Sequence, residues 1–255
     1  MCRILSGLLF VLLLAAPLSS RAGSEAGDCN APDEFATADE SFADVGAAIA
    51  SGGPVAILAV GSATTVGSVN RSGQPTSTTE AFPGFMLHAL EAALPAIKFT
   101  LNVQGGRGMT AEDMLPLIET SLKQQHYALV LWQTGTVEAV RGLRPDAMQD
   151  VLQDGVQRAR DAGADVVLID PQFSRFLRAN TDLDAYEGVM QQVATMPGVV
   201  LFRRFDLMRA WANDGRVDLE RTAAADRGKA LDLLNRCLGQ TLARFILSGV
   251  DSARR

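Results

Sequence analysis

Five short apolar runs, separated by helical patterns, constrain the fold of this chain most. The runs are rich in Val, Ile and Leu and almost continuously apolar, which is typical of strands buried on both faces of a parallel sheet. They cover residues 54–60, 97–103, 127–133, 164–170 and 198–204. The helical patterns cover residues 80–94, 110–125, 144–163, 183–196 and about 231–248. This alternation predicts right-handed crossovers and an α/β three-layer sandwich with about five parallel strands.

The first 22 residues predict a secretory signal peptide. Arg3 precedes an apolar run over residues 4–18, and Ser20 and Ala22 have the small-x-small spacing of a cleavage site. The alternative is a membrane anchor, but the run is shorter than the ~20 residues that a span needs. We therefore expect a periplasmic or secreted protein with no stable membrane span after cleavage.

The rest of the chain is long enough for one α/β domain with a sizeable core. We expect a polar N-terminal arm over residues 23–45 and a single domain over residues 46–255. The formal net charge is −6, and residues 1–22 carry two arginines and no acid, so the mature chain is more acidic still. This sign of charge argues against nucleic acid and anionic lipid surfaces as main partners.

Cysteine and histidine contents bear on the compartment and on metals. Cys2 leaves with the signal peptide, and Cys29 and Cys237 remain as an even pair. In an exported protein such a pair favours a disulfide, the alternative being two free buried thiols. The chain has only two histidines, His88 and His126, and neither has other ligands at metal spacing. We expect no metal and no cofactor.

Four stretches follow the predicted strands at the edge where open α/β sheets bind ligands. They contain "GSATTVG" (61–67), "GRGMT" (106–110), "TGTVE" (134–138) and "DRGK" (226–229). Together they resemble the four sequence blocks of the SGNH (GDSL) hydrolases, which are esterases and lipases with a flavodoxin-like three-layer fold. The resemblance covers nearly the whole mature chain and implies that fold.

The first block departs from the family at its nucleophile. The family has G-D-S-x-[ST]-x-G, whose serine attacks the acyl carbon. Gly61, Thr65 and Gly67 match this frame, which puts Ser62 at the aspartate position and Ala63 at the serine position.

The other three blocks are kept in part. The resemblance assigns Gly108 to the family glycine whose N–H points at the oxyanion. Val137 replaces the asparagine that supplies a second oxyanion donor. In the D-x-x-H block, Asp226 is kept and Lys229 stands where the histidine belongs. No histidine follows residue 126, so the family base is missing in any register.

These replacements predict a protein that has lost the family's catalysis. Alanine has no hydroxyl, valine has no side-chain amide, and lysine is a cation at neutral pH and a poor base. We therefore expect a pseudoenzyme that binds a carbohydrate or an acylated small ligand in the former crevice. Trp132, at the end of a predicted strand, is a candidate for stacking on a sugar ring.

Two other functions remain open. The first is an active ester hydrolase or acyltransferase in which Ser62 attacks and Lys229 acts as base after burial lowers its pKa. It requires Ser62 and Lys229 within hydrogen-bond reach, with Asp226 turned away. The second is an interaction protein that uses its helical surface and has no function in the crevice. The pair Arg203–Arg204 is predicted to be solvated surface or a charge that flanks a helix.

Overall fold

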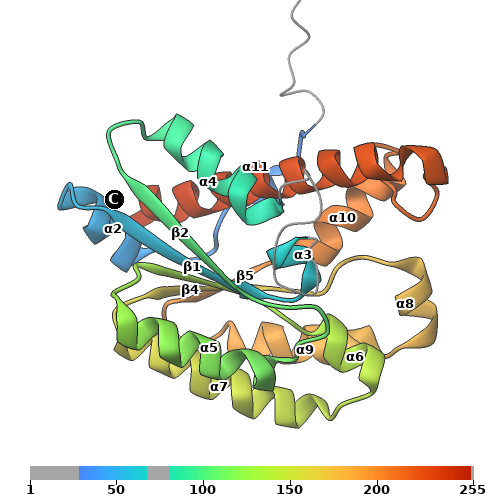
Figure 1. The fold of residues 1–255 in the computed structure, drawn as a ribbon, viewed down its shortest axis with the longest axis horizontal. Helices are drawn as coiled ribbons and strands as arrows, with labels where there is room; N and C mark the ends of the chain where they lie inside the picture. The colour runs from blue at the N-terminus through green and yellow to red at the C-terminus, as the bar shows by residue number, and fades with distance from the viewer. Residues whose placement is uncertain (1–28, 68–80, 254–255) are drawn as a thin grey trace, which may run out of the picture.

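A single parallel sheet organises the chain, in the order β2-β1-β3-β4-β5. In the computed structural model, which describes residues 29–67 and 81–253, the sheet lies between two layers of helices (Figure 1). The strands are β1 (Val55–Gly61), β2 (Phe99–Gly105), β3 (Leu129–Gln133), β4 (Asp165–Ile169) and β5 (Val199–Phe202). β1 pairs with both β2 and β3, and Ile57 lies opposite Leu101 in the first ladder and opposite Leu129 in the second. The predicted five-stranded parallel α/β fold is confirmed.

Helices cover both faces of the sheet. The helices are α1 (Asp33–Ala36), α2 (Ala43–Ala50), α3 (Ala63–Val66), α4 (Phe82–Ala93), α5 (Ala111–Gln124), α6 (Thr136–Arg141), α7 (Pro145–Asp161), α8 (Arg175–Asn180), α9 (Leu183–Val193), α10 (Arg204–Asn213), the 3-10 turn η2 (Ala224–Asp226) and α11 (Arg227–Ala253). Helices α2, α4, α10 and α11 lie on one face, and α5, α7 and α9 lie on the other (Figure 1). Each layer buries its own apolar core against the sheet.

Helices α4, α5, α7 and α9 begin and end close to where their patterns predict, whereas the short helices α3, α6 and α8 were not predicted. Thr110 caps α5, and its side chain and that of Asp113 form a capping box. The fifth predicted strand is too long: β5 ends at Phe202, and residues 204–213 form α10. α11 starts earlier and ends later than predicted.

The segment before β1 packs on α11. Cys29 and Cys237 form a disulfide, which confirms the predicted pairing. Phe35 and Phe42 are buried in the core under α11, and the Phe42 N–H donates to the Gly249 carbonyl at 3.2 Å. Residues 29–45 of the predicted arm therefore lie against the domain. The predicted signal peptide lies outside the described residues, and within those residues no helix is long and apolar enough to cross a bilayer.

Candidate functional site

An open hollow of about 430 Å³ lies at the carboxyl edge of the sheet. Its residues come from the ends of β1, β2, β3 and β4 and from the short helices that follow them, which lie at one end of the sheet in Figure 1. The lining residues are Ser62, Ala63, Thr64, Arg107, Gly108, Thr136, Val137, Val140, Arg141, Gln172 and Leu177. Four of the six predicted site positions therefore meet here: Ser62, Ala63, Gly108 and Val137.

The Ser62 hydroxyl is held by a neutral amide. Gln133 Oε1, at the end of β3, accepts hydrogen bonds from Ser62 N at 3.2 Å and from Ser62 Oγ at 3.1 Å. The same oxygen accepts from the hydroxyls of Thr64 and Thr65, both at 3.0 Å. An amide oxygen cannot take the proton that an attacking serine must lose. Ala63, the next residue, presents only a methyl group to the hollow.

A buried arginine, Arg204, and a buried aspartate, Asp170, lie behind this network. Arg204 is 1% exposed, and its Nη1 donates to Thr64 Oγ1 at 3.1 Å, so the expectation that it is solvated is wrong. Burial lowers the pKa of Arg204 to about 10, and nearby Asp170 opposes this. Burial raises the pKa of Asp170 to about 8, against the hydrogen bond that its carboxylate accepts from Phe205 N at 2.8 Å. Arg204 thus holds the Thr64 side chain in place, and neither Arg204 nor Asp170 lines the hollow.

The second and third family blocks form one wall of the hollow. Gly108 has φ +78°, a left-handed conformation that strongly favours glycine. Its carbonyl accepts from Arg141 Nη2 at 2.8 Å, which joins the loop after β2 to α6. Val137, on α6, adds an aliphatic surface where the family has an amide.

The structure places the last two predicted residues away from the hollow. Asp226 and Lys229 face each other at 3.9 Å, and their side chains are 61% and 88% exposed. Neither lines the hollow, and among the described residues no hydrogen bond joins Ser62 to Lys229. The Ser62–Lys229 dyad thus has no support in this geometry.

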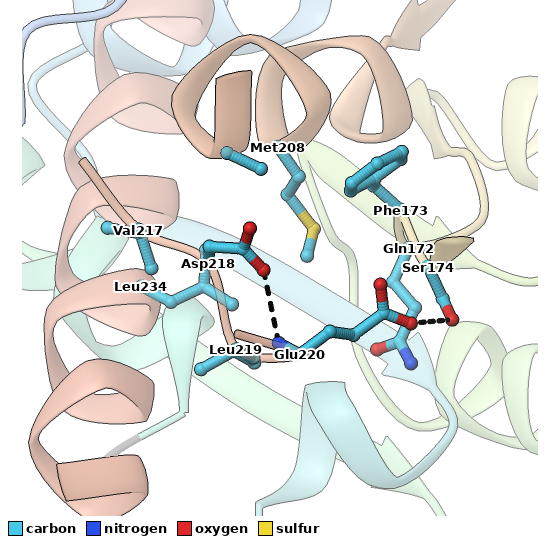
Figure 2. Close-up of a pocket in the computed structure, with 10 residues that line it drawn as sticks. Gln172, Phe173, Ser174, Met208, Val217, Asp218, Leu219, Glu220 and Leu234 are labelled. Atoms are coloured by element: carbon cyan, nitrogen blue, oxygen red, sulfur yellow. Dashed lines mark hydrogen bonds between the residues drawn. The ribbon is translucent and has the colours of Figure 1, made fainter. Parts of the chain in front are cut away.

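The segment just before η2 binds the start of α8 and borders a second hollow. Residues Val217, Asp218 and Glu220 border a small hollow of about 130 Å³ between α10, α11 and the segment after β4 (Figure 2). Glu220 accepts hydrogen bonds from Ser174 Oγ at 2.7 Å and from the N–H of Arg175 at 2.9 Å. Asp218 forms an ion pair with Arg175 at 3.0 Å. These carboxylates form a clamp on the start of α8, and the two positions of the family's acid–base block, Asp226 and Lys229, lie after this clamp, in η2 and α11.

Sequence reasoning missed the residues that give the site its polarity. Gln133 is the last residue of a buried strand, and it was the one signal available, because a polar residue at the carboxyl end of a parallel strand faces the ligand edge. Arg107 and Arg141 were not singled out. Trp132 is 1% exposed, so it is not available to stack on a sugar.

No group of three or more metal-ligating side chains occurs in the part of the chain that the structure describes. The site's described side chains are hydroxyls, amides, guanidinium groups and aliphatic groups.

The comparisons with known proteins agree with this architecture. The model of the non-GDSL lipase-like family matches residues 28–252. No curated protein matches the chain in sequence.

Solved structures give the fold. A catalytic mutant of Axe2, an acetylxylan esterase from Geobacillus stearothermophilus, superposes with a TM-score of 0.58 at 15% identity, over 77% of this chain and 94% of that one. TesA gives a TM-score of 0.52 at 20% identity, over 72% and 97% of the two chains. AlinE4, an SGNH-hydrolase family esterase, gives 0.50 at 20% identity, over 63% and 80%. The chain thus belongs to the non-GDSL lipase-like family and has the α/β fold of the SGNH hydrolases.

Proposed function

We propose that this protein is an exported pseudoenzyme that binds a carbohydrate or an acylated small ligand in the hollow at the carboxyl edge of its sheet. One observation carries the proposal. The hollow is open, but Ala63 stands at the nucleophile position and the neighbouring Ser62 hydroxyl donates to the neutral amide of Gln133.

The volume and lining support binding. About 430 Å³ lies within the range of small-molecule sites, which combine apolar walls with a few polar groups. The polar residues Ser62, Thr64 and Thr136 line the hollow beside Val137 and Val140. Export is supported by the signal-like sequence and by the Cys29–Cys237 disulfide, since disulfides persist mainly in oxidising compartments.

The first experiment asks whether Ser62 is a nucleophile. The purified protein and its Ser62→Ala variant are exposed to a fluorophosphonate, and their intact masses are measured. We expect no adduct on either, because in the part of the chain that the structure describes the Ser62 hydroxyl donates to the neutral amide of Gln133 and not to a base. A stoichiometric adduct that disappears in Ser62→Ala would refute the pseudoenzyme and support hydrolysis by Ser62.

The second experiment asks whether the hollow binds. Ligand-induced thermal stabilisation is measured with aliphatic and sugar fragments for the wild type, for Val137→Trp and for Val103→Trp. Val137 lines the hollow, whereas Val103 is an exposed residue of β2 that does not. Binding in the hollow predicts that stabilisation is lost in Val137→Trp and retained in Val103→Trp. No stabilisation of the wild type by any fragment would favour the interaction protein.

A further inference from the structure

The charge of the hollow is opposite to that of the chain. Arg107 and Arg141 line it, and no Asp or Glu is among its described lining residues. The chain as a whole has a formal net charge of −6. A ligand that enters this hollow therefore meets two cations and no acidic side chain among the described lining residues, which favours an anionic group.

Both guanidinium groups have donors left for a ligand. Arg141 uses Nη2 to hold the Gly108 carbonyl, which fixes its side chain at the rim. Arg107 is exposed, and within the described part of the chain it forms no hydrogen bond or ion pair. The pKa of Asp113 is lowered chiefly by the hydrogen bonds that its carboxylate accepts from Thr110 N and Oγ1, both at 2.9 Å, and the charge of nearby Arg141 adds only a smaller effect. Neither arginine is neutralised by an ion pair among the described residues.

The remaining wall is aliphatic. Val137, Val140 and Leu177 line it, and Val140 is 57% exposed. Phe176, beside Leu177 on α8, is 68% exposed outside the hollow. No aromatic side chain is among the described lining residues, so the hollow lacks the stacking platform typical of sugar sites. Burying an exposed aliphatic wall favours a hydrocarbon chain, at roughly 25 cal/mol per Å² removed from water.

We propose that the ligand is an aliphatic chain with an anionic oxygen head group. Arg107 and Arg141 bind the head group, a carboxylate or a phosphate, by charge-assisted hydrogen bonds. The chain lies along Val137, Val140 and Leu177. This inference rests on the proposed function, and it selects the acylated over the carbohydrate ligand.

The test compares probes of equal chain length. Decanoate, decyl phosphate and uncharged decanamide are titrated into the full-length mature protein by calorimetry, below their micelle concentrations. We expect the two anions to bind about tenfold or more tightly than decanamide, since a charge-assisted pair of hydrogen bonds contributes about 1.4 kcal/mol or more. The stronger of the two anions identifies the head group.

Variants assign the preference to the two arginines. Arg107→Gln should lower the affinity for the anions about three- to tenfold without affecting folding, because Arg107 forms no hydrogen bond or ion pair with the described residues that the change would remove. Arg141→Lys should keep most of the affinity, and Arg141→Gln should lose it. The control is Arg144→Gln. Arg144 is exposed and borders a separate hollow between α5 and α7, so this variant should bind the anions as the wild type does.

The outcomes separate this inference from the proposed function. Equal affinity for decanoate and decanamide, unchanged in Arg107→Gln, would overturn the anionic ligand and leave binding in the hollow intact. Binding of neutral sugar fragments alone would also overturn it. If no probe and no fragment binds, both the inference and the proposed function fail.

Discussion

At the scale of single residues, two buried polar side chains, Gln133 and Arg204, hold the hydroxyl groups at the base of the site. Gln133 Oε1 accepts from four donors, and Arg204 donates to Thr64. Arg204 Nε and Nη2 are buried and have no hydrogen-bond partner among the residues that the structure describes. Desolvating a guanidinium and a carboxyl together costs free energy, and Asp170 offsets part of it only when it is ionised.

This arrangement predicts a pH dependence of stability. Burial raises the pKa of Asp170 to about 8 from an ordinary value of 3.8. Between these values the native state keeps a proton that the unfolded chain releases, so the free energy of unfolding falls as pH rises. One such group contributes a slope of up to about 1.4 kcal/mol per pH unit. The stability is fully present below about pH 4 and is lost as pH rises through 8.

The variant Asp170→Asn keeps an acceptor for Phe205 N and cannot ionise. We expect urea unfolding between pH 5 and 7.5 to show a flatter pH dependence for this variant than for the wild type. Asp214→Asn, a change at an exposed aspartate, is the control and should retain the wild-type slope. Identical slopes in wild type and Asp170→Asn would mean that Asp170 is ionised throughout this range.

At the scale of elements, features that depend on residues close in sequence were predictable. Apart from the Cys29–Cys237 disulfide, contacts between residues far apart in sequence were not. The capping box of Thr110 and Asp113 depends on residues three apart, and the strands depend on continuous apolar runs. The short helices α3, α6 and α8 have too few residues for a periodic pattern, and α10 follows β5 with almost no connection. The Gln133 network and the clamp from Glu220 to α8 join residues far apart in sequence, so no local pattern reports them.

The contact between α4 and α11 gives a sharp test of packing. A Cβ on Gly239 would lie 2.6 Å from both Met86 N and Phe82 O, which are backbone atoms that cannot turn aside. We expect Gly239→Ala to destabilise the protein by about 1–3 kcal/mol in urea unfolding, as overpacking does.

The matched control is Gly228→Ala in the same helix. A Cβ there meets no atom within 4 Å, so the higher helix propensity of alanine should stabilise by up to about 1 kcal/mol. A neutral Gly239→Ala would mean that α4 and α11 can move apart without loss.

At the scale of the whole molecule, the last helix connects distant parts of the chain. α11 packs on α4 and carries Cys237, whose disulfide with Cys29 spans 208 positions in sequence. The segment before β1 also contacts α11 noncovalently, because Ala38 N donates a hydrogen bond to Ser248 Oγ at 2.8 Å. The covalent bond and the packing therefore hold the same two segments together.

Removing the disulfide should weaken the fold without changing it. We expect the double variant Cys29→Ala, Cys237→Ala to lose about 2–5 kcal/mol of stability, because the bond closes a long loop in the unfolded chain. Thermal unfolding is measured with and without reductant. Reductant should lower the Tm of the wild type and leave the double variant unchanged; equal sensitivity of the two proteins would show that the bond does not limit unfolding.

The same cross-link also determines how the molecule responds to damage. A protease that cuts the backbone once, anywhere between residues 29 and 237, separates the chain into two pieces that stay covalently attached. A cut between β1 and β5 leaves strands of the one sheet on both pieces, and the nicked molecule migrates as a single species on a non-reducing gel. The two fragments separate on a gel only after the disulfide is reduced. In an oxidising compartment, a protein that has been cut once in this range therefore remains a single covalent molecule.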